Sequence, residues 1–373
     1  MRLANVDAMN TPFAIGEVIT ALKALHNNKS GGVDGVPAEA FKYARREVEN
    51  KTEFVLAPHL LKLMEHIRAT GDYPRQFEIS SITPIHKKGD VQEMGNYRGL
   101  AVGGALSKLY AFLLERRLST WGESSGARSP YQGGFRSKRG TCHNLFVLRH
   151  LTDKSKCDTG KPLLVCQVDF EKAFDKVPRE LLWMRLEERG VTGATLDALK
   201  ACYQRVELKV NVNRVLGDSF LSFQGVKQGC PMSPTLYGIF GEGFADYVEA
   251  KDHLAPDAMA AHDCPISDDV RIPLKLYADD LSLFAASHRR LMALLRSLRE
   301  WCEAFGMSMN AGKCDVLYFH SDQVTCKAMY TLGEYGLVPI MVKERGVQVM
   351  KSLPWKDRAR YLGLHYGPGT TFE

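Results

Sequence analysis

The chain has 373 residues, of which 45% are hydrophobic and 25% charged, an ordinary composition for a globular protein with its own core. No apolar stretch of about 18 residues and no secretory signal are present, so the sequence predicts a soluble, intracellular protein with no membrane span. The nine cysteines include no C-x-x-C pair, and their odd number argues against a disulfide framework; the sequence also contains no Cys/His zinc-knuckle pattern.

In chain order, the first predicted element is an amphipathic helix over 12–26, with Thr11 as its N-cap and Pro12 at its first position. A glycine-rich loop follows at 27–32. Apolar periodicity then predicts helices over 58–69 and 104–121 and a strand over 79–86.

The second half of the chain predicts strands that alternate with helices. The expected strands cover 163–168, 206–212, 219–224, 272–277, 281–285 and 314–319. The expected helices cover 178–189, a stretch from Pro231 or Pro234 to about Ala250, and 288–304. A turn is expected near Gly217-Asp218, and 252–270 is expected to be a loop. Helices that alternate with hairpins, without a regular βαβ rhythm, indicate an α+β fold.

Positive charge is concentrated in one part of the sequence. Residues 81–150 contain eleven basic and four acidic side chains, a net charge of +7, whereas the whole chain carries +6. Such a region is the expected footprint of a polyanion, although charge alone leaves a solvated basic surface equally open.

Two adjacent carboxylates, Asp279 and Asp280, fall at the turn between two apolar strands, and Asp169 ends another apolar strand. Asp-Asp in isolation is most often only a polar turn. If these strands pair in one sheet, however, three carboxylates meet where desolvation would be costly without a cation. Oxygen ligands without histidine or cysteine favour Mg²⁺, with Mn²⁺ as the alternative, and two such ions suit phosphoryl displacement.

The surrounding segments resemble the motifs of reverse transcriptases from non-LTR (LINE-type) retrotransposons. They run in family order from about residue 11 to 366. The matching stretches are TPIHKKGD at 83–90, NYR at 96–98, YQGGFR at 131–136, QVDFEKAFDKV at 167–177, QGVKQGCPMSP at 224–234, LYADD at 276–280, MNAGK at 309–313 and YLG at 361–363. One departure is Gly99-Leu100-Ala101, where many relatives carry Pro-Ile-Ser.

The resemblance implies a right-hand polymerase fold with fingers and palm and with the thumb largely absent. Residues 1–160 would form an N-terminal extension and fingers, 161–330 the palm with part of the fingers interleaved, and 331–373 the end of the palm with the primer grip. We expect an endonuclease domain and the helical thumb to belong to segments outside this chain.

The resemblance also assigns residues to the chemistry. Asp169, Asp279, Asp280 and the backbone of Phe170 would hold two Mg²⁺ ions, and Lys313 would protonate the departing pyrophosphate or be simply solvated. Tyr277 and Gly363 would contact the primer and template, with ordinary packing as the alternative for Tyr277.

A further group would bind the incoming nucleotide. Lys88 and Arg98 match residues that clamp the triphosphate, and Gln228 and Gly229 match the loop against the nucleotide and template. Phe170 belongs to the same pocket. Phe174 occupies the position where an aromatic face excludes the 2′-hydroxyl, unless it only packs in the core.

The implied function is RNA-directed DNA polymerisation with an RNA template, a DNA primer and deoxynucleotides as partners, and with a nuclear location. Three alternatives remain. They are a decayed or domesticated copy that binds nucleic acid without polymerising, a group II intron maturase-type reverse transcriptase, and an RNA-dependent RNA polymerase. Phe174 argues against the last, because an RNA polymerase must admit the 2′-hydroxyl.

Overall fold

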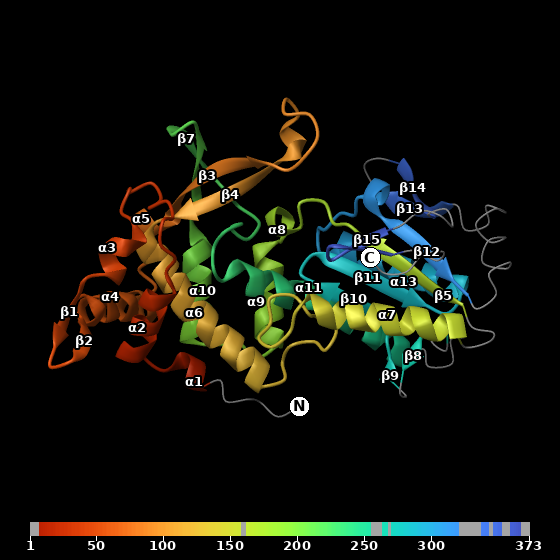
Figure 1. Cartoon of the computed structure of the whole chain (residues 1–373), viewed down its shortest axis with the longest axis horizontal. Coiled ribbons are helices and arrows are strands. Elements are labelled where there is room, and N and C mark those ends of the chain that lie inside the picture. The colour runs from red at the N-terminus through yellow and green to blue at the C-terminus, as the bar shows by residue number, and fades with distance from the viewer. Residues whose placement is uncertain are drawn as a thin grey trace. The chain divides into compact units, whose positions relative to one another are not determined.

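A computed structural model gives the fold of the chain and describes residues 7–157, 162–254, 263–267, 270–320, 337–342, 346–352 and 359–366. It contains helices and sheets, which confirms the predicted mixture of α and β structure (Figure 1). The chain divides into two compact units, residues 1–127 with 177–237 (unit 1) and residues 128–176 with 238–373 (unit 2). Neither unit is a continuous stretch of sequence.

Unit 1 contains a four-stranded sheet in the order β4-β3-β6-β7. Its strands are β3 (Ile79–His86), β4 (Tyr97–Gly103), β6 (Glu207–Val212) and β7 (Val215–Leu221). β3 is antiparallel to β4 and parallel to β6. The β3–β4 hairpin projects as a long ribbon (Figure 1).

Several helices and a small hairpin complete unit 1. They are α1 (Asp7–Asn10), α2 (Ile15–Ala24), α3 (Ala38–Lys42), β1 (Arg45–Val48), β2 (Lys51–Phe54), α4 (Ala57–Thr70), α5 (Arg75–Glu78), α6 (Ala105–Ser124), α9 (Arg179–Glu188) and α10 (Ala194–Gln204). α6 supplies much of the core, because Leu109, Tyr110 and Leu113 on it are fully buried. α11 (Ser233–Leu254) begins in unit 1 and continues in unit 2.

Unit 2 contains a six-stranded sheet in the order β10-β11-β5-β12-β14-β13. The strands are β5 (Leu163–Val168), β10 (Leu274–Tyr277), β11 (Asp280–Ala285), β12 (Asp315–Phe319), β13 (Leu337–Val342) and β14 (Gly346–Ser352). Unit 2 also contains α7 (Thr141–Cys157), α8 (Ala173–Lys176), α13 (His288–Ala304), the 3-10 helix η2 (Ala311–Lys313), and the short pairs β8 (Ile266–Ser267) with β9 (Val270–Arg271) and β15 (Ala359–Tyr361) with β16 (Leu364–Tyr366).

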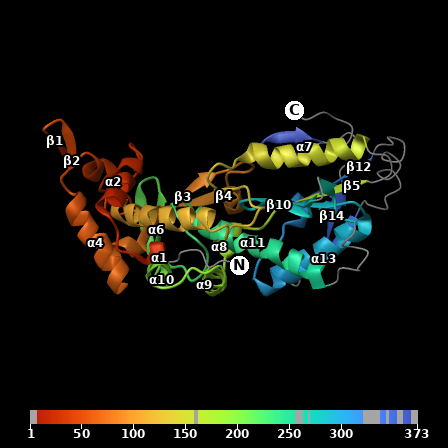
Figure 2. The same cartoon turned by 90° about the horizontal axis from the view of Figure 1, so that it is seen from below.

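β5 is buried on both faces because helices cover the sheet from two sides. α7 lies along one face and α13 along the other (Figure 2). Leu163 and Val165 of β5 join a core cluster with Leu148 of α7 and with Tyr361 and Tyr366 of the β15–β16 hairpin. The continuous apolar run of β5 therefore reflects burial on both faces.

Several predicted elements have the predicted bounds, namely β3, β5 and α13. The helix predicted over 12–26, which is α2, is an exception. It begins at Ile15 with Ala14 as its N-cap, so the prediction of Thr11 as N-cap was wrong. Tertiary contacts hold the preceding backbone out of the helix, because Arg117 donates hydrogen bonds to the carbonyls of Thr11 and Pro12.

Two other predictions also differ from the structure. The β6–β7 turn lies at Asn213-Arg214, both with positive φ, whereas Gly217 and Asp218 lie inside β7. Within 252–270, α11 continues to Leu254 and β8 and β9 pair, so the described part is not all loop. The described cysteines are free thiols, and most of them are buried.

Candidate active site

The register of the central strands brings Asp169 and Asp280 next to each other. Val168 at the end of β5 pairs with Leu281 of β11, so Asp169 and Asp280 occupy the next position of the two antiparallel strands. Tyr277 pairs with Asp280 across the β10–β11 hairpin, which leaves Ala278 and Asp279 as its turn. All three predicted carboxylates therefore lie where β5 ends and β11 begins, at one end of the strands in the sheet of unit 2 (the aspartate edge).

Negative charge is concentrated at this edge of the sheet. Asp280 reaches solvent at the turn, but much of its surroundings is protein. Burial first, and then the charges of Asp279 and Asp169, raise the pKa of Asp280 to about 6. Mutual repulsion of this kind is what a divalent cation would relieve.

The carboxylate oxygens of the three aspartates fit a hard cation, although they are not arranged as a complete metal site. Within the ranges that the structure describes, no three carboxylate, imidazole or thiol groups converge closely enough to hold a metal ion. The three aspartates nevertheless lie near enough to interact electrostatically, and they offer only oxygen donors. This chemistry suits Mg²⁺ or Mn²⁺.

The segment containing Lys313 lies directly against Asp169. The carbonyl of Asp169 accepts a hydrogen bond from the Asn310 amide at 2.8 Å, and Phe170 forms an isolated bridge with Met309. Nζ of Lys313 is 3.9 Å from Oδ2 of Asp169. The structure thus brings the predicted Lys313 to the aspartate edge, as a long and largely exposed ion pair.

Phe174 lies close in sequence to the same edge, on the short helix α8, and its side chain is half-buried. A half-buried ring has one part packed and another part open, so the structure leaves both the sugar-excluding role and the packing role available to it. Asp175, which follows it, is exposed.

Tyr277 and Gly363 lie on the two hairpins that were expected to meet the primer. Tyr277 is half-buried on β10, beside the turn. Gly363 lies in the β15–β16 turn with a φ of +92°, which favours glycine.

Buried polar contacts join the β15–β16 hairpin to the sheet. Nε2 of Gln167 on β5 donates to the Tyr366 hydroxyl at 2.6 Å. Nδ2 of Asn144 on α7 donates to the Tyr361 hydroxyl at 3.1 Å and to the carbonyl of Leu276 at 2.9 Å. Sequence reasoning assigned no role to Gln167 or Asn144, and their short-range patterns give no signal of these contacts.

In unit 1, Lys88 and Arg98 are exposed on the β3–β4 hairpin. Arg98 pairs with Ile85 across the ladder, and the loop beyond is tied by the Tyr97 hydroxyl, which donates to the carbonyl of Val91 at 2.8 Å. Both cations are therefore available to an anionic ligand while their backbone is held in place.

Gln228 and Gly229 lie against β4 in the same unit. The carbonyl of Gln228 accepts a hydrogen bond from the Ala101 amide at 2.7 Å. Gly229 has a φ of +108°, and a Cβ there would come within 2.7 Å of the Ala101 carbonyl oxygen. Glycine is thus required by both conformation and space. The departure at Gly99-Leu100-Ala101 lies within regular strand, and Leu100 also packs next to Gly229.

The basic stretch at 81–150 is not all surface. Arg117, which is buried, forms an ion pair with the half-buried Glu17, and Arg128 forms a fully buried one with Glu242 at 2.7 Å. The stretch is also divided between the two units. Only part of the +7 charge is available to a polyanion, and two of its members stabilise the fold instead.

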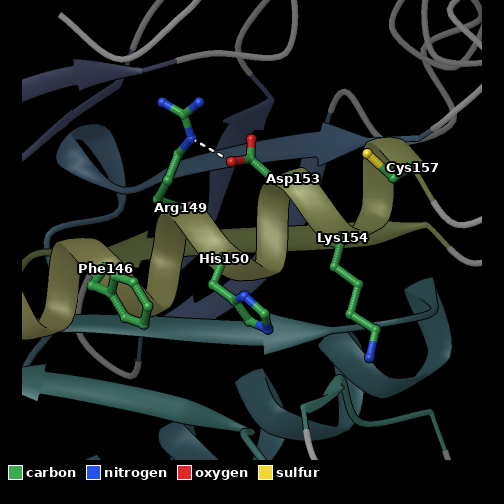
Figure 3. Close-up of a pocket in the computed structure, with 6 residues that line it drawn as sticks. All are labelled: Phe146, Arg149, His150, Asp153, Lys154 and Cys157. Atoms are coloured by element: carbon green, nitrogen blue, oxygen red, sulfur yellow. Dashed lines mark hydrogen bonds and ion pairs between the residues drawn. The ribbon is translucent and has the colours of Figure 1, made fainter.

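A separate hollow of about 300 Å³ opens on the exposed face of α7 (Figure 3). Its polar side chains are already engaged: Arg149 pairs with Asp153, and His150 and Lys154 reach β8. None of the predicted site residues lines it.

Among the described helices, none has the length and apolar character needed to cross a membrane.

Comparison with known proteins agrees with the motifs. The family model described as reverse transcriptase (RNA-dependent DNA polymerase) matches residues 85–366. A Xenopus laevis protein named transposon TX1 uncharacterized 149 kDa protein is 26% identical over 75% of this chain and 20% of its own length. The probable RNA-directed DNA polymerase from transposon BS of Drosophila melanogaster is 24% identical over 97% of this chain and 36% of its own length.

A third relative is the RNA-directed DNA polymerase from mobile element jockey of Drosophila funebris, which is 25% identical over 69% of this chain and 27% of its own length. The chain therefore spans well under half the length of these curated relatives. The family match covers most of the chain and confirms the family indicated by the sequence motifs. The chain belongs to the reverse transcriptase (RNA-dependent DNA polymerase) family.

Proposed function

We propose that this chain is an RNA-directed DNA polymerase of a LINE-type element, which adds deoxynucleotides to the 3′-hydroxyl of a DNA primer on an RNA template. The observation that carries the proposal is the pairing of β5 with β11, which places Asp169 beside Asp280 at the edge that also bears Asp279. Membership of the reverse transcriptase family supports the same reaction.

Asp169, Asp279 and Asp280, with the backbone carbonyl of Phe170, are the groups that would hold two Mg²⁺ or Mn²⁺ ions. When bound, such ions stabilise the attacking and leaving oxygens of an in-line phosphoryl displacement. Lys313 would give a proton to the departing pyrophosphate, and its Nζ, 3.9 Å from Oδ2 of Asp169, supports this role.

Other residues would bind the substrates. Lys88 offers a point charge and Arg98 a bidentate fork to phosphate oxygens, and the Gln228-Gly229 backbone would lie against the nucleotide. The face of Phe174 would exclude the 2′-hydroxyl, and Tyr277 and Gly363 would contact the primer.

We extend the proposal to the architecture. The sheet of unit 2 would be the palm, because it carries the aspartates, and the β3–β4 hairpin would belong to the fingers. The right-hand arrangement, the boundaries at 160 and 330, and a nuclear location stay predictions. An endonuclease domain and a thumb segment are proposed partners, in keeping with the greater length of the relatives.

Primer extension tests the function directly. An RNA template with an annealed DNA primer is incubated with the chain and deoxynucleotides, with Mg²⁺, with Mn²⁺, or with a chelator. We expect extension that requires the cation and prefers deoxynucleotides. Template binding without extension would favour a domesticated nucleic-acid-binding protein, and preferential use of ribonucleotides would favour an RNA polymerase.

A further inference from the structure

The turn that carries Asp279 is supported by the segment 131–134 of unit 2. The Leu276 amide donates to the carbonyl of Tyr131 at 3.0 Å, and the Gly133 amide donates to the carbonyl of Leu276 at 2.8 Å. Gln132 and Leu276 form an isolated parallel bridge. The segment therefore runs along the free edge of β10, directly before the turn.

Gln132 reaches the turn itself. Its side chain is fully buried, and its Oε1 accepts hydrogen bonds from the Ala278 amide at 3.1 Å and from the Gly134 amide at 2.8 Å. Two N–H donors face this atom, which fixes the orientation of the side-chain amide. The Ala278 amide belongs to the turn, beyond the last ladder pair, so Gln132 supplies the acceptor that the sheet does not.

The backbone conformation of Ala278 shows what this hydrogen bond stabilises. Ala278 has a φ of +58°, in the left-handed region that side chains other than glycine rarely adopt. A residue held in such a conformation persists only when its surroundings enforce it. The Gln132 side chain, buried beneath the turn, is a group that enforces it.

Gly134 shows how closely the two backbones approach. A Cβ at Gly134 would lie 2.3 Å from the Ala278 nitrogen and 2.9 Å from the Tyr277 carbonyl carbon, both of which are backbone atoms. By contrast, a Cβ at Gly140, in the same connection before α7, would meet nothing within 4 Å.

The supporting segment is itself anchored. Nη1 of Arg136 donates to the carbonyls of Ser129 and Gln132 at 2.6 and 3.3 Å. At its start, Glu242 accepts hydrogen bonds from Nε of Arg128 and from the Ser129 amide. The backbone that carries Gln132 is therefore held in place.

We propose that Gln132 is a positioning residue, which holds Ala278 in its left-handed conformation so that Asp279 and Asp280 keep their places at the sheet edge. The catalytic consequence rests on the proposed function of these aspartates. The structural part, a clamp on the turn, stands on the hydrogen bonds alone.

Two variants separate a hydrogen-bonding role from simple packing. Gln132→Met keeps the length and loses the acceptor, whereas Gln132→Glu keeps the acceptor and adds a buried charge. We expect kcat for primer extension to fall in the order wild type, Gln132→Glu, Gln132→Met, by about tenfold or more for Gln132→Met, with the KM for deoxynucleotide and the affinity for template within about twofold. If kcat of Gln132→Met stays within about twofold of wild type, the side chain only packs and the proposal is overturned.

Gly134→Ala and its matched control Gly140→Ala test the close approach with the Gln132 side chain itself unchanged, although the added Cβ at Gly134 would also lie 3.1 Å from Oε1 of Gln132. We expect kcat to fall for Gly134→Ala and to stay near wild type for Gly140→Ala. Equal activity of the two variants would show that the turn does not depend on this contact and would overturn the proposal.

A readout independent of activity separates this proposal from the proposed function. Hydrogen exchange of the Ala278 amide, followed by NMR on protein labelled at alanine, should be slow in the wild type and about tenfold or more faster in Gln132→Met. This comparison holds even if the wild-type chain does not extend primers. Unchanged protection of Ala278 in Gln132→Met would overturn the clamp.

Discussion

Val168 pairs with Leu281 across β5 and β11, and this single register places Asp169 beside Asp280. A slip of one residue would turn every side chain of β5 to the opposite face. The next pair along the ladder holds the register, because the Ser282 hydroxyl donates to Oε1 of Gln167 at 2.7 Å inside a buried sheet. Hydrophobic burial alone would not distinguish the two faces of β5, since both are covered.

The first prediction concerns two of the three aspartates. Asp169→Asn or Asp279→Asn should lower primer extension by about 100-fold or more, because each removes a charge that would hold the cation. Template binding, measured by fluorescence anisotropy, should stay near wild type because basic side chains hold the phosphates. Asp218→Asn, on exposed strand β7, is the control. Near-normal extension by Asp279→Asn would refute the metal assignment.

The second prediction concerns sugar selectivity. Phe174→Val should increase the use of ribonucleotides relative to deoxynucleotides by about tenfold, since a smaller side chain leaves room for the 2′-hydroxyl. The ratio of kcat/KM values for the two nucleotides measures this. Phe146→Val, which shortens an exposed ring on α7, should leave the ratio unchanged. A folded Phe174→Val variant with wild-type selectivity would show that Phe174 only packs.

How far the sequence predicted the structure depended on the kind of signal. β3, β5 and α13 were predicted at their observed bounds, because their apolar pattern records how they are buried. α7 was missed because polar residues, among them Asn144 and Thr152, occupy its buried face and weaken the helical pattern. The turn at Asn213-Arg214 was missed because Gly217-Asp218 offered a stronger local signal.

The candidate site shows the same division. The carboxylates were singled out because their residue type carries the chemistry, and the glycines because their segments resemble family motifs; the roles of both stay predictions. The hydrogen bond between Gln132 and Ala278 spans 146 residues of sequence, and no local sequence pattern near either residue predicts it. The two tyrosine contacts of the β15–β16 hairpin are likewise made only by the folded sheet.

The third prediction concerns the β15–β16 hairpin. Tyr366→Phe should destabilise the chain by about 1–3 kcal/mol, because it removes the buried acceptor of Gln167. Urea unfolding of Tyr366→Phe, Gln167→Met and the double variant forms a double-mutant cycle. We expect the double variant to cost less than the sum of the two single variants. Strict additivity would show that the two side chains do not interact in solution.

The fourth prediction concerns the buried pair of Arg128 and Glu242, whose side chains are 2% and 0% exposed. Glu242→Ala should lower the free energy of unfolding by about 3–5 kcal/mol, because it leaves Arg128 buried without its counterion. Glu53→Ala, which breaks the exposed pair with Arg46, should have a much smaller effect. An equally small effect of Glu242→Ala, measured by urea unfolding, would contradict this role.

The fifth prediction concerns Lys275 on β10, whose Nζ donates to the carbonyl of Pro130 at 3.1 Å. Burial first, and then the charges of Arg139 and Arg136, lower the pKa of Lys275 to about 8. Its pKa in the unfolded chain is about 10.4. Between these values the unfolded state binds more protons, so this group makes stability rise with pH from 8 to above 10, and below pH 8 it costs stability.

Lys275→Met should therefore raise the free energy of unfolding at pH 7, because it removes a desolvated charge; this gain is about 1–3 kcal/mol. The loss of the hydrogen bond to Pro130 reduces the gain. The difference from wild type should shrink steadily as the pH rises through 8 towards 10.5, because the wild-type side chain then becomes neutral as well. Lys138→Met removes an exposed cation nearby and measures the effect of losing a solvated positive charge. Urea unfolding of all three proteins at several pH values gives the comparison. A difference between Lys275→Met and wild type that stays constant from pH 7 to 10 would show that Lys275 is not desolvated beside Arg136 and Arg139.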